Sequence, residues 1–416
     1  MKSKVEKIEQ FLILFVIASL FFENVLLFSL FGGSIKVSHI AMILAIVYGF
    51  FYCAHTVKEY IGLLFFLLFP LIPLYRINDI GSFLSSYINY AIIVFFVCFA
   101  LKIMRKAFCK DAVFYLRFYN IIVSLASVLA IIQFIMMNLF GIFWLDGFWG
   151  SFQFHHSSYG IEMGLYRAYS VFHEPSYLGF VCNLGIAINL AVPDTMYKEN
   201  KKRIFFITLY AIAVFCTVSA SALLIMAGLF VAYCVFSSKT QKKTLIAITL
   251  VVLMLIIFFI AIAVLDIDIP ILDMLFDRLF KESDREGTSA YERLKTPAEY
   301  VKKTFAHYPF FGRGIGQEGN VDAVGVIGRF KGIHNSVYGI VVTFGLSSIA
   351  FAICFIKEFF SAKFKGKYFG ARVILFLSLI GMYMSTGSYI SGDTFILVII
   401  VLLILFSLVP NHEKKL

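Results

Sequence analysis

The residues best suited to chemistry fall within one stretch, Tyr166 to Gly179, which reads Tyr-Arg-Ala-Tyr-Ser-Val-Phe-His-Glu-Pro-Ser-Tyr-Leu-Gly. Its spacing puts Arg167, His173 and Glu174 at the start of an apolar segment, where an arginine can bind an anion and a histidine or glutamate can exchange a proton. A structural alternative exists. The arginine then only extends toward lipid headgroups, and Glu174 with Pro175 only begins a helix, since both residue types suit a helix start.

A second polar group lies later in the chain. Tyr308 to Gly316 reads Tyr-Pro-Phe-Phe-Gly-Arg-Gly-Ile-Gly, and Gly332-Ile-His-Asn-Ser336 then opens another apolar segment. The run lacks the strand and helix context of a dinucleotide site. His334 stands at the expected helix start, either as a proton acceptor or as a hydrogen-bonded boundary residue. Three glycines allow either close approach of a ligand to the backbone or a tight turn; they are Gly312, Gly314 and Gly316.

The composition predicts that a membrane-embedded bundle positions these groups. The chain has 416 residues, of which 61% are hydrophobic and 15% charged, with a mean hydropathy of +0.89. A soluble protein of this size could not bury so much apolar surface. The net charge of +11 does not indicate nucleic-acid binding, because the basic residues form short clusters between apolar segments, where they set topology. The first apolar segment has no small-residue cleavage site and is expected to be a retained helix.

We expect an all-α polytopic membrane protein with about twelve transmembrane helices, forming one integral membrane domain over residues 1–416. The seventh and eighth spans are short and share a turn, so their count is the least certain. The expected spans are 10–31, 38–54, 59–75, 84–102, 114–142, 174–192, 203–219, 222–237, 244–264, 334–356, 370–389 and 393–410.

The distribution of lysine and arginine predicts cytoplasmic N- and C-termini. Most of the 36 basic residues fall in the segments then assigned to the cytoplasm, whereas the short outer connections carry only Lys36, Arg76 and Arg167. Two outer segments stand out. The segment 143–173 holds the arginine motif and both tryptophans, which are typical interfacial anchors. The segment 265–333 is a large late loop, expected to contain an amphipathic helix from Ala290 to Tyr308.

The polar groups gather at one face, which favours binding or chemistry at the outer surface. Arg167, Arg293 and Arg313 all lie in the outer segments and suit the headgroup of a phosphate-bearing lipid. The sequence has no Walker loop, no HExxH, no paired cysteines and no acidic metal cage. A secondary transporter would typically place ionisable groups at the midplane of two related halves. Glu23, within the first expected span, is expected to face the bundle and to be paired.

The signature Arg-x-x-Ser-x-Phe-x-Glu-Pro-Ser, formed here by Arg167, Ser170, Phe172, Glu174, Pro175 and Ser176, resembles that of Wzy-type O-antigen and capsular polysaccharide polymerases, members of the O-antigen ligase/polymerase superfamily. The resemblance covers nearly the whole chain, although Thr288 to Arg293 departs from the Ser-Gly-Arg often found in the family. Further matches, in chain order, are Arg293, Pro309 with Gly312, Gly314 and Gly316, His334-Asn335-Ser336, and Phe344-Gly345-Leu346.

This resemblance implies a polymerase that joins undecaprenyl-pyrophosphate-linked oligosaccharide repeat units into O-antigen, capsule or exopolysaccharide. It implies a metal-independent, inverting glycosyl transfer without a cofactor, at the outward face of the bacterial inner (cytoplasmic) membrane. A chain-length regulator and a flippase are expected in the same membrane. A ligase of the same superfamily, which differs in its acceptor, is the near alternative. A lipid-linked oligosaccharide flippase or transporter is the alternative from another class.

The resemblance also implies roles for site residues. Arg167 and Arg293 are assigned to the pyrophosphate, with Arg313 as a third cation. His334 is the first choice for the proton acceptor or for positioning the acceptor, and Glu174 is the second. The residues expected to support the motif are Ser170, Pro175, Ser176, Gly312, Gly314, Gly316 and Asn335.

Overall fold

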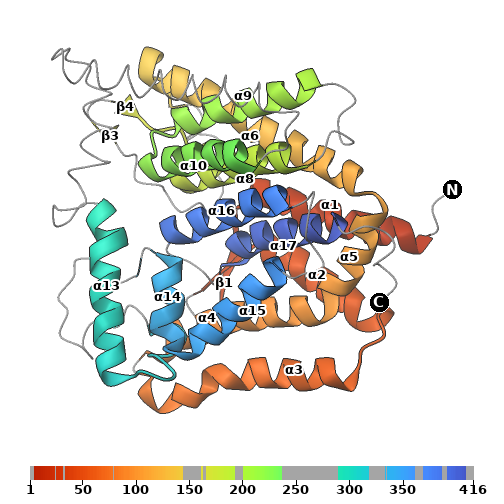
Figure 1. Cartoon of the computed structure of the whole chain (residues 1–416), viewed down its shortest axis with the longest axis vertical. Helices are drawn as coiled ribbons and strands as arrows, with labels where there is room; N and C mark the ends of the chain where they lie inside the picture. Colours follow the sequence, from red (N-terminus) through yellow and green to blue (C-terminus); the bar gives the residue numbers. More distant parts are fainter. Residues whose placement is uncertain are drawn as a thin grey trace.

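The computed structural model describes twelve stretches of the chain, among which helices predominate (Figure 1). Most of the two expected outer segments lies outside these stretches, as do the ninth expected span, both tryptophans and His334. The described residues are 4–23, 25–30, 33–77, 79–143, 161–162, 165–192, 200–236, 289–317, 333, 335–360, 369–386 and 391–408.

The first part of the chain forms helices joined by one hairpin, and the second part is again helical apart from one short hairpin. The elements up to residue 140 are α1 (Lys4–Ser19), η1 (Leu20–Phe22), β1 (Leu26–Leu30), β2 (Gly33–Lys36), α2 (Val37–Tyr52), α3 (Val57–Leu68), η2 (Phe69–Arg76), α4 (Ile80–Phe95), the π-helical η3 (Phe96–Ala100), α5 (Leu101–Lys110) and α6 (Ala112–Phe140). Those that follow are β3 (Ile161–Glu162), β4 (Leu165–Tyr166), α8 (Pro175–Ala191), α9 (Asn200–Cys216), α10 (Ala220–Phe236), α13 (Ser289–His307), α14 (Ser336–Phe344), α15 (Ser347–Phe359), α16 (Phe369–Ser385) and α17 (Gly392–Ser407).

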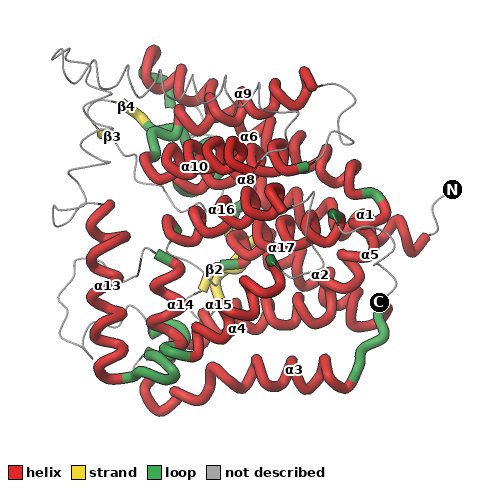
Figure 2. Tube along the Cα trace, in the orientation of Figure 1, coloured by secondary structure: helices red, strands yellow, loops and turns green. Residues whose placement is uncertain are grey.

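The helical class is confirmed, with two corrections. The fold is not purely α-helical, because β1 pairs with β2 and β3 with β4 in short antiparallel hairpins (Figure 2). The first expected span, 10–31, is also too long. Its helix ends at Phe22. In the hairpin that follows, Lys36 pairs with Leu26 and so lies close to the helix end. There its ammonium group meets the carboxylate of Glu23.

The tenth expected span, 334–356, is not one continuous helix. A turn at Gly345 separates α14 from α15, with φ of 59° at the glycine. The amides of Leu346 and Ser347 donate to the carbonyls of Pro309 and Phe310, at 2.7 and 3.2 Å. The helix therefore breaks because the chain that follows α13 occupies this position. The seventh and eighth expected spans are separate helices, α9 and α10.

Within the described residues, three stretches are long and apolar enough to cross a membrane: Val57–Tyr75, Ile80–Lys110 and Ala112–Phe140. Other apolar helices are shorter, among them α2, α8, α10 and α16. The number of twelve spans therefore stays a prediction.

Helix α8 is enclosed by other helices of the bundle. Every residue from Ser176 to Leu190 is buried, and the helix packs against α6, α9, α10 and α16 (Figure 1). An apolar helix buried on all sides is expected at the core of a large bundle. Helix α13 instead runs crosswise past the ends of the bundle helices. Its bounds, Ser289–His307, confirm the helix predicted at 290–308, and it ends before Pro309.

Candidate active site

The segment that leads into α8 is held by side chains of α6. The backbone amides of Tyr169 and Ser170 both donate to Oε1 of Gln133, at 3.0 and 2.7 Å. The Ser170 hydroxyl donates to the Ala126 carbonyl at 2.8 Å, and Ser170 has a positive φ of 56°. A buried glutamine that satisfies two amides offsets this unusual backbone conformation. The serine of the signature therefore shapes the segment.

Arg167 is bound to the end of α9. Its Nε donates to the carbonyl of Thr217 at 3.0 Å, and the amide of the next residue, Ala168, donates to the carbonyl of Cys216 at 3.0 Å. The side chain is half-buried. The protein therefore sets the direction of this guanidinium. An arginine that only extended toward lipid headgroups would not need such a bond.

Glu174 and Pro175 begin α8, as the sequence predicts, but the glutamate is not a side-chain cap. Pro175 is the first helical residue, and the Glu174 carboxylate makes no capping bond to the helix backbone. That carboxylate is exposed and accepts a hydrogen bond from the Ser176 hydroxyl at 2.9 Å. A direct capping bond therefore does not explain the acidic residue, although its charge suits the positive end of the helix dipole.

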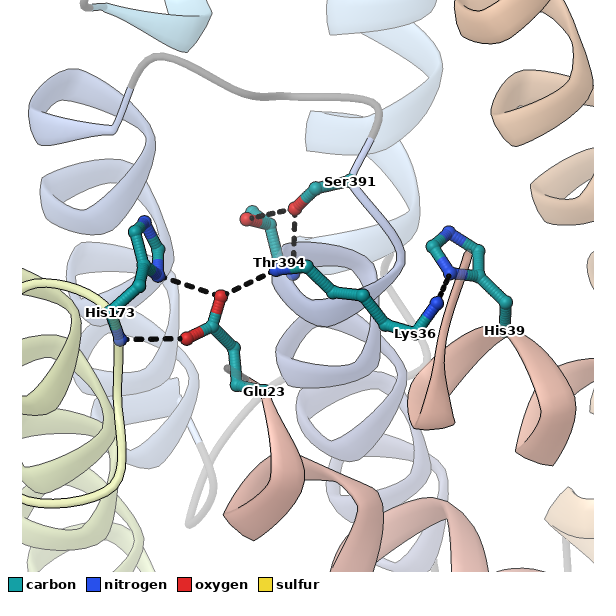
Figure 3. A network of polar contacts seen from close by, with 6 residues as sticks. All are labelled: Glu23, Lys36, His39, His173, Ser391 and Thr394. Carbon is teal, nitrogen blue, oxygen red and sulfur yellow. Dashed lines mark hydrogen bonds and ion pairs between the residues drawn. The ribbon is translucent and has the colours of Figure 1, made fainter. Parts of the chain in front are cut away.

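Glu23 reaches the same segment from the end of the first helix (Figure 3). Its carboxylate is 1% exposed, and Oε1 lies 2.7 Å from both the Lys36 ammonium and Nδ1 of His173. The backbone amide of His173 donates to Oε2 at 3.1 Å. Burial alone would raise the pKa of Glu23, but Lys36 and His173 hold that pKa well below its ordinary range. The expectation that Glu23 is paired is confirmed.

The three glycines of the second polar group form a turn against protein backbone. The amides of Arg313 and Gly314 donate to the carbonyls of Val342 and Thr343 at the end of α14, at 2.9 and 3.1 Å. Gly312 has a φ of +62°, and a Cβ there would collide with the same two carbonyls. The tight-turn alternative therefore accounts for this run, and the space beside Gly312 is taken up by α14.

Arg313 is buried between α13 and α14. It is 4% exposed, and its guanidinium lies 5.4 Å from the centre of the Tyr300 ring. Burial lowers the pKa of Arg313, although an arginine stays charged at neutral pH. Tyr300 also packs against Ile333, the residue before His334. Arg313 and the His334 segment therefore share one small cluster.

Asn335 begins α14 as a buried N-cap. Its side-chain oxygen accepts from the amides of Val337 and Tyr338, at 3.1 and 3.3 Å. The Ser336 hydroxyl donates to the carbonyl of Thr386, just after α16, at 2.8 Å. His334 is next to this cap but lies outside the described residues.

Helix α16 joins the two polar groups. It packs along α8 and also contacts α14. The two groups lie on either side of it (Figure 1). The backbone of Arg293 lies in α13, and its side chain is not among the parts of the chain that the structure describes. No three His, Cys, Asp or Glu residues of the described chain are grouped so as to hold a metal ion.

With this geometry in place, a comparison with known families decides the identity. The chain matches the model of the WcaD colanic acid polymerase family over residues 7–406, which includes both polar groups. It belongs to this family. Among curated proteins, none matches significantly. The resemblance to Wzy-type polysaccharide polymerases is thereby confirmed. Membership of the WcaD family, together with the apolar helices, identifies a membrane protein of polysaccharide synthesis.

Two residues that organise the site of this WcaD-family chain were not among the predicted site residues. Gln133 holds the signature segment, and Lys36 completes the ion pair of Glu23. A glutamine in a long apolar span was a usable signal, because polar groups in such spans are costly and usually partnered. Lys36 had no comparable signal in its sequence, because its position depends on a hairpin whose apolar first strand looks like a continuation of the helix.

Proposed function

We propose that this chain joins undecaprenyl-pyrophosphate-linked oligosaccharide repeat units at the outer face of the bacterial inner membrane. The product is O-antigen, capsule or exopolysaccharide. The observation that carries the proposal is the anchored position of Arg167, with Glu174 near it, at the entrance of the buried helix α8 in a member of a polysaccharide polymerase family.

In the proposed reaction, a hydroxyl oxygen of the acceptor repeat unit attacks the anomeric carbon of the donor with inversion. The bond between that carbon and the pyrophosphate oxygen breaks, and its electron pair stays on the lipid pyrophosphate. Arg167 and Arg293 stabilise this charge, with Arg313 as a third cation. The acceptor proton passes to His334, or to Glu174 as the second choice. The transfer uses neither a metal nor a cofactor.

The geometry of the first polar group supports the role of Arg167. Stabilising a leaving pyrophosphate requires a cation that is already in place before the charge develops. The bond to Thr217 and the anchoring of Ser170 on Gln133 fix the segment that carries Arg167. Arg313 is enclosed more deeply than Arg167, which agrees with its place as the third cation.

The proposed arrangement has cytoplasmic termini, a single membrane domain, and segments 143–173 and 265–333 facing outward. A chain-length regulator and a flippase are the proposed partners in the membrane. Reporter fusions at Lys106, Lys201, Lys242 and Lys365 are expected to report cytoplasm. Fusions near Ser151 and Asp284 are expected to report the outer side. An outer-side report at Lys201 would mean that the two polar segments do not face the same side of the membrane.

The function is tested by deleting the protein in its host and sizing the surface polysaccharide. If the protein is a polymerase, the lipid carriers of the deletion strain should bear a single repeat unit. The wild-type gene should restore longer chains, and the Arg167→Ala gene should not. Full-length chains that stay on the lipid carrier would instead indicate a ligase. Repeat units retained on the cytoplasmic face would indicate a flippase.

A further inference from the structure

We propose that His173 is a further cation of the transfer site, held in place by Glu23, and that it binds the leaving pyrophosphate. The inference rests on the proposed function. It concerns a position that the signature leaves open, between Phe172 and Glu174.

The geometry fixes the imidazole at two points. The ring nitrogen Nδ1 lies 2.7 Å from Oε1 of Glu23, and the backbone amide of His173 donates to the other carboxylate oxygen at 3.1 Å. The ring also contacts Tyr177 in the first turn of α8, with 5.7 Å between ring centres. Such double attachment of one residue to one carboxylate leaves the ring little rotational freedom.

The other ring nitrogen is available to a ligand. Glu23 occupies the Nδ1 edge, and Figure 3 shows the Nε2 edge turned away from the carboxylate. The side chain of His173 is 35% exposed, whereas that of Glu23 is 1% exposed. The carboxylate is thus buried, and the ring is the most exposed part of the cluster, ahead of Lys36 at 18%.

The charges favour an anion at this ring. Glu23 and Lys36 compensate each other, so a protonated His173 gives these three residues a net positive charge, while the exposed carboxylate of Glu174 stands beside them. Burial lowers the pKa of His173, but the attraction of Glu23 outweighs it and raises the pKa above the ordinary value for histidine. Lys36 acts against this rise, and Glu174 adds to it. Among the described residues, the titratable groups around the ring are these three and Tyr177.

His173 belongs to the same fixed segment as Arg167. Ser170 lies between them, anchored on Gln133, so the two cations are carried by one rigid piece of chain before α8. When the bond to the anomeric carbon breaks, the electron pair stays on the pyrophosphate oxygen. The imidazolium then donates a hydrogen bond from Nε2 and keeps its proton. Glu23 is a positioning residue in this scheme, because it acts only through His173.

The scheme predicts opposite effects for two variants around one carboxylate. Polymerisation is measured against pH with purified full-length protein and lipid-linked single repeat units from the deletion strain. If activity requires protonated His173, it falls on the alkaline side of its pH profile. Glu23→Gln removes the raising charge and moves this fall to lower pH by about one unit. Lys36→Met removes the lowering charge and moves it to higher pH.

The matched control is Glu6→Gln, which removes a carboxylate from an exposed pair with Lys110 (3.1 Å) and should leave the profile unchanged. His173→Lys supplies a cation that titrates only near pH 10. The His173→Lys protein should be active without the alkaline fall in its pH profile. If Glu23→Gln fails to fold, this variant alone tests whether activity requires a cation at position 173. Shifts of Glu23→Gln and Lys36→Met in the same direction, or none, would overturn the inference. Wild-type polymerisation in the same assay shows that the proposed function itself stands.

Discussion

The two polar groups of the molecule are built by different means. The signature segment before α8 is attached mainly through side chains, beside one backbone bond from Ala168 to Cys216: Gln133 holds two of its amides, and Glu23 holds His173. The glycine turn after α13 is attached through backbone, with its amides on the carbonyls of α14. Side-chain attachment fixes the direction of ionisable groups, whereas backbone attachment fixes the path of the chain. The signature segment is therefore suited to holding ionisable groups in place, and the glycine turn to setting the path of the chain.

The largest effect is expected at Arg167, where this contrast predicts direct loss of chemistry. Arg167→Ala should abolish polymer while the protein remains folded and inserted in the membrane. Arg167→Lys should rescue poorly, because a point charge does not replace a planar bidentate donor. Product length in the reconstituted assay measures both. Full activity of the lysine variant would mean that only a charge near the headgroups is needed.

The next effect separates the two candidates for the proton acceptor. His334→Ala should slow turnover by about a hundredfold or more, with less effect on binding of the lipid-linked donor. Glu174→Gln keeps the shape of the residue but loses its basicity, and it should keep measurable activity. If His334→Ala polymerises normally and Glu174→Gln does not, the two roles are exchanged. If both polymerise normally, the acceptor of the proton lies elsewhere.

A smaller effect is expected from loosening the signature segment without touching an ionisable group. Gln133→Leu leaves the amides of Tyr169 and Ser170 without their buried acceptor, which costs about 1–3 kcal/mol of stability. The rate should fall about tenfold as the segment loses its position. Melting temperature and turnover are measured on the same preparation. An unchanged rate in a destabilised protein would show that this anchoring serves folding alone.

The smallest effect on the rate is expected at the glycine turn. Gly312→Ala meets two backbone carbonyls and a positive φ, so it should lower stability by about 2 kcal/mol or more, while the protein that remains folded turns over nearly normally. Gly228→Ala in α10 is the control, since nothing lies within 4 Å of its added Cβ. A folded Gly312→Ala protein without activity would move this turn into the active site.

The sequence predicted much of this contrast, and its failures have physical reasons. The proline that begins α8 and the amphipathic α13 follow from local rules, and both are confirmed. The break at Gly345 was missed because apolar residues continue on both sides of it, while its cause is the distant chain at Pro309. The end of the first helix was missed because β1, the strand that follows it, is as apolar as the helix.

The candidate site was predictable by residue type and less so by arrangement. Arg167 and Glu174 follow from the signature, but their partners do not. The bond from Arg167 to Thr217 and the approach of Glu23 to His173 depend on helices that are far apart in the sequence. From the sequence, the three glycines fitted a ligand site and a tight turn equally well. The packing of protein around them distinguishes the two, with α14 beside Gly312 and Ser82 of α4 beside Gly316.

The central claim is that the rigid signature segment carries out glycosyl transfer between lipid-linked repeat units. The most direct measurement incubates the purified protein in liposomes with undecaprenyl-pyrophosphate-linked single repeat units and resolves the products by length. The account predicts a ladder of longer lipid-linked chains, one released undecaprenyl pyrophosphate for each bond formed, and no ladder with Arg167→Ala. A ladder of equal length from Arg167→Ala would contradict it. So would no extension by a wild-type protein that restores polymer in the host.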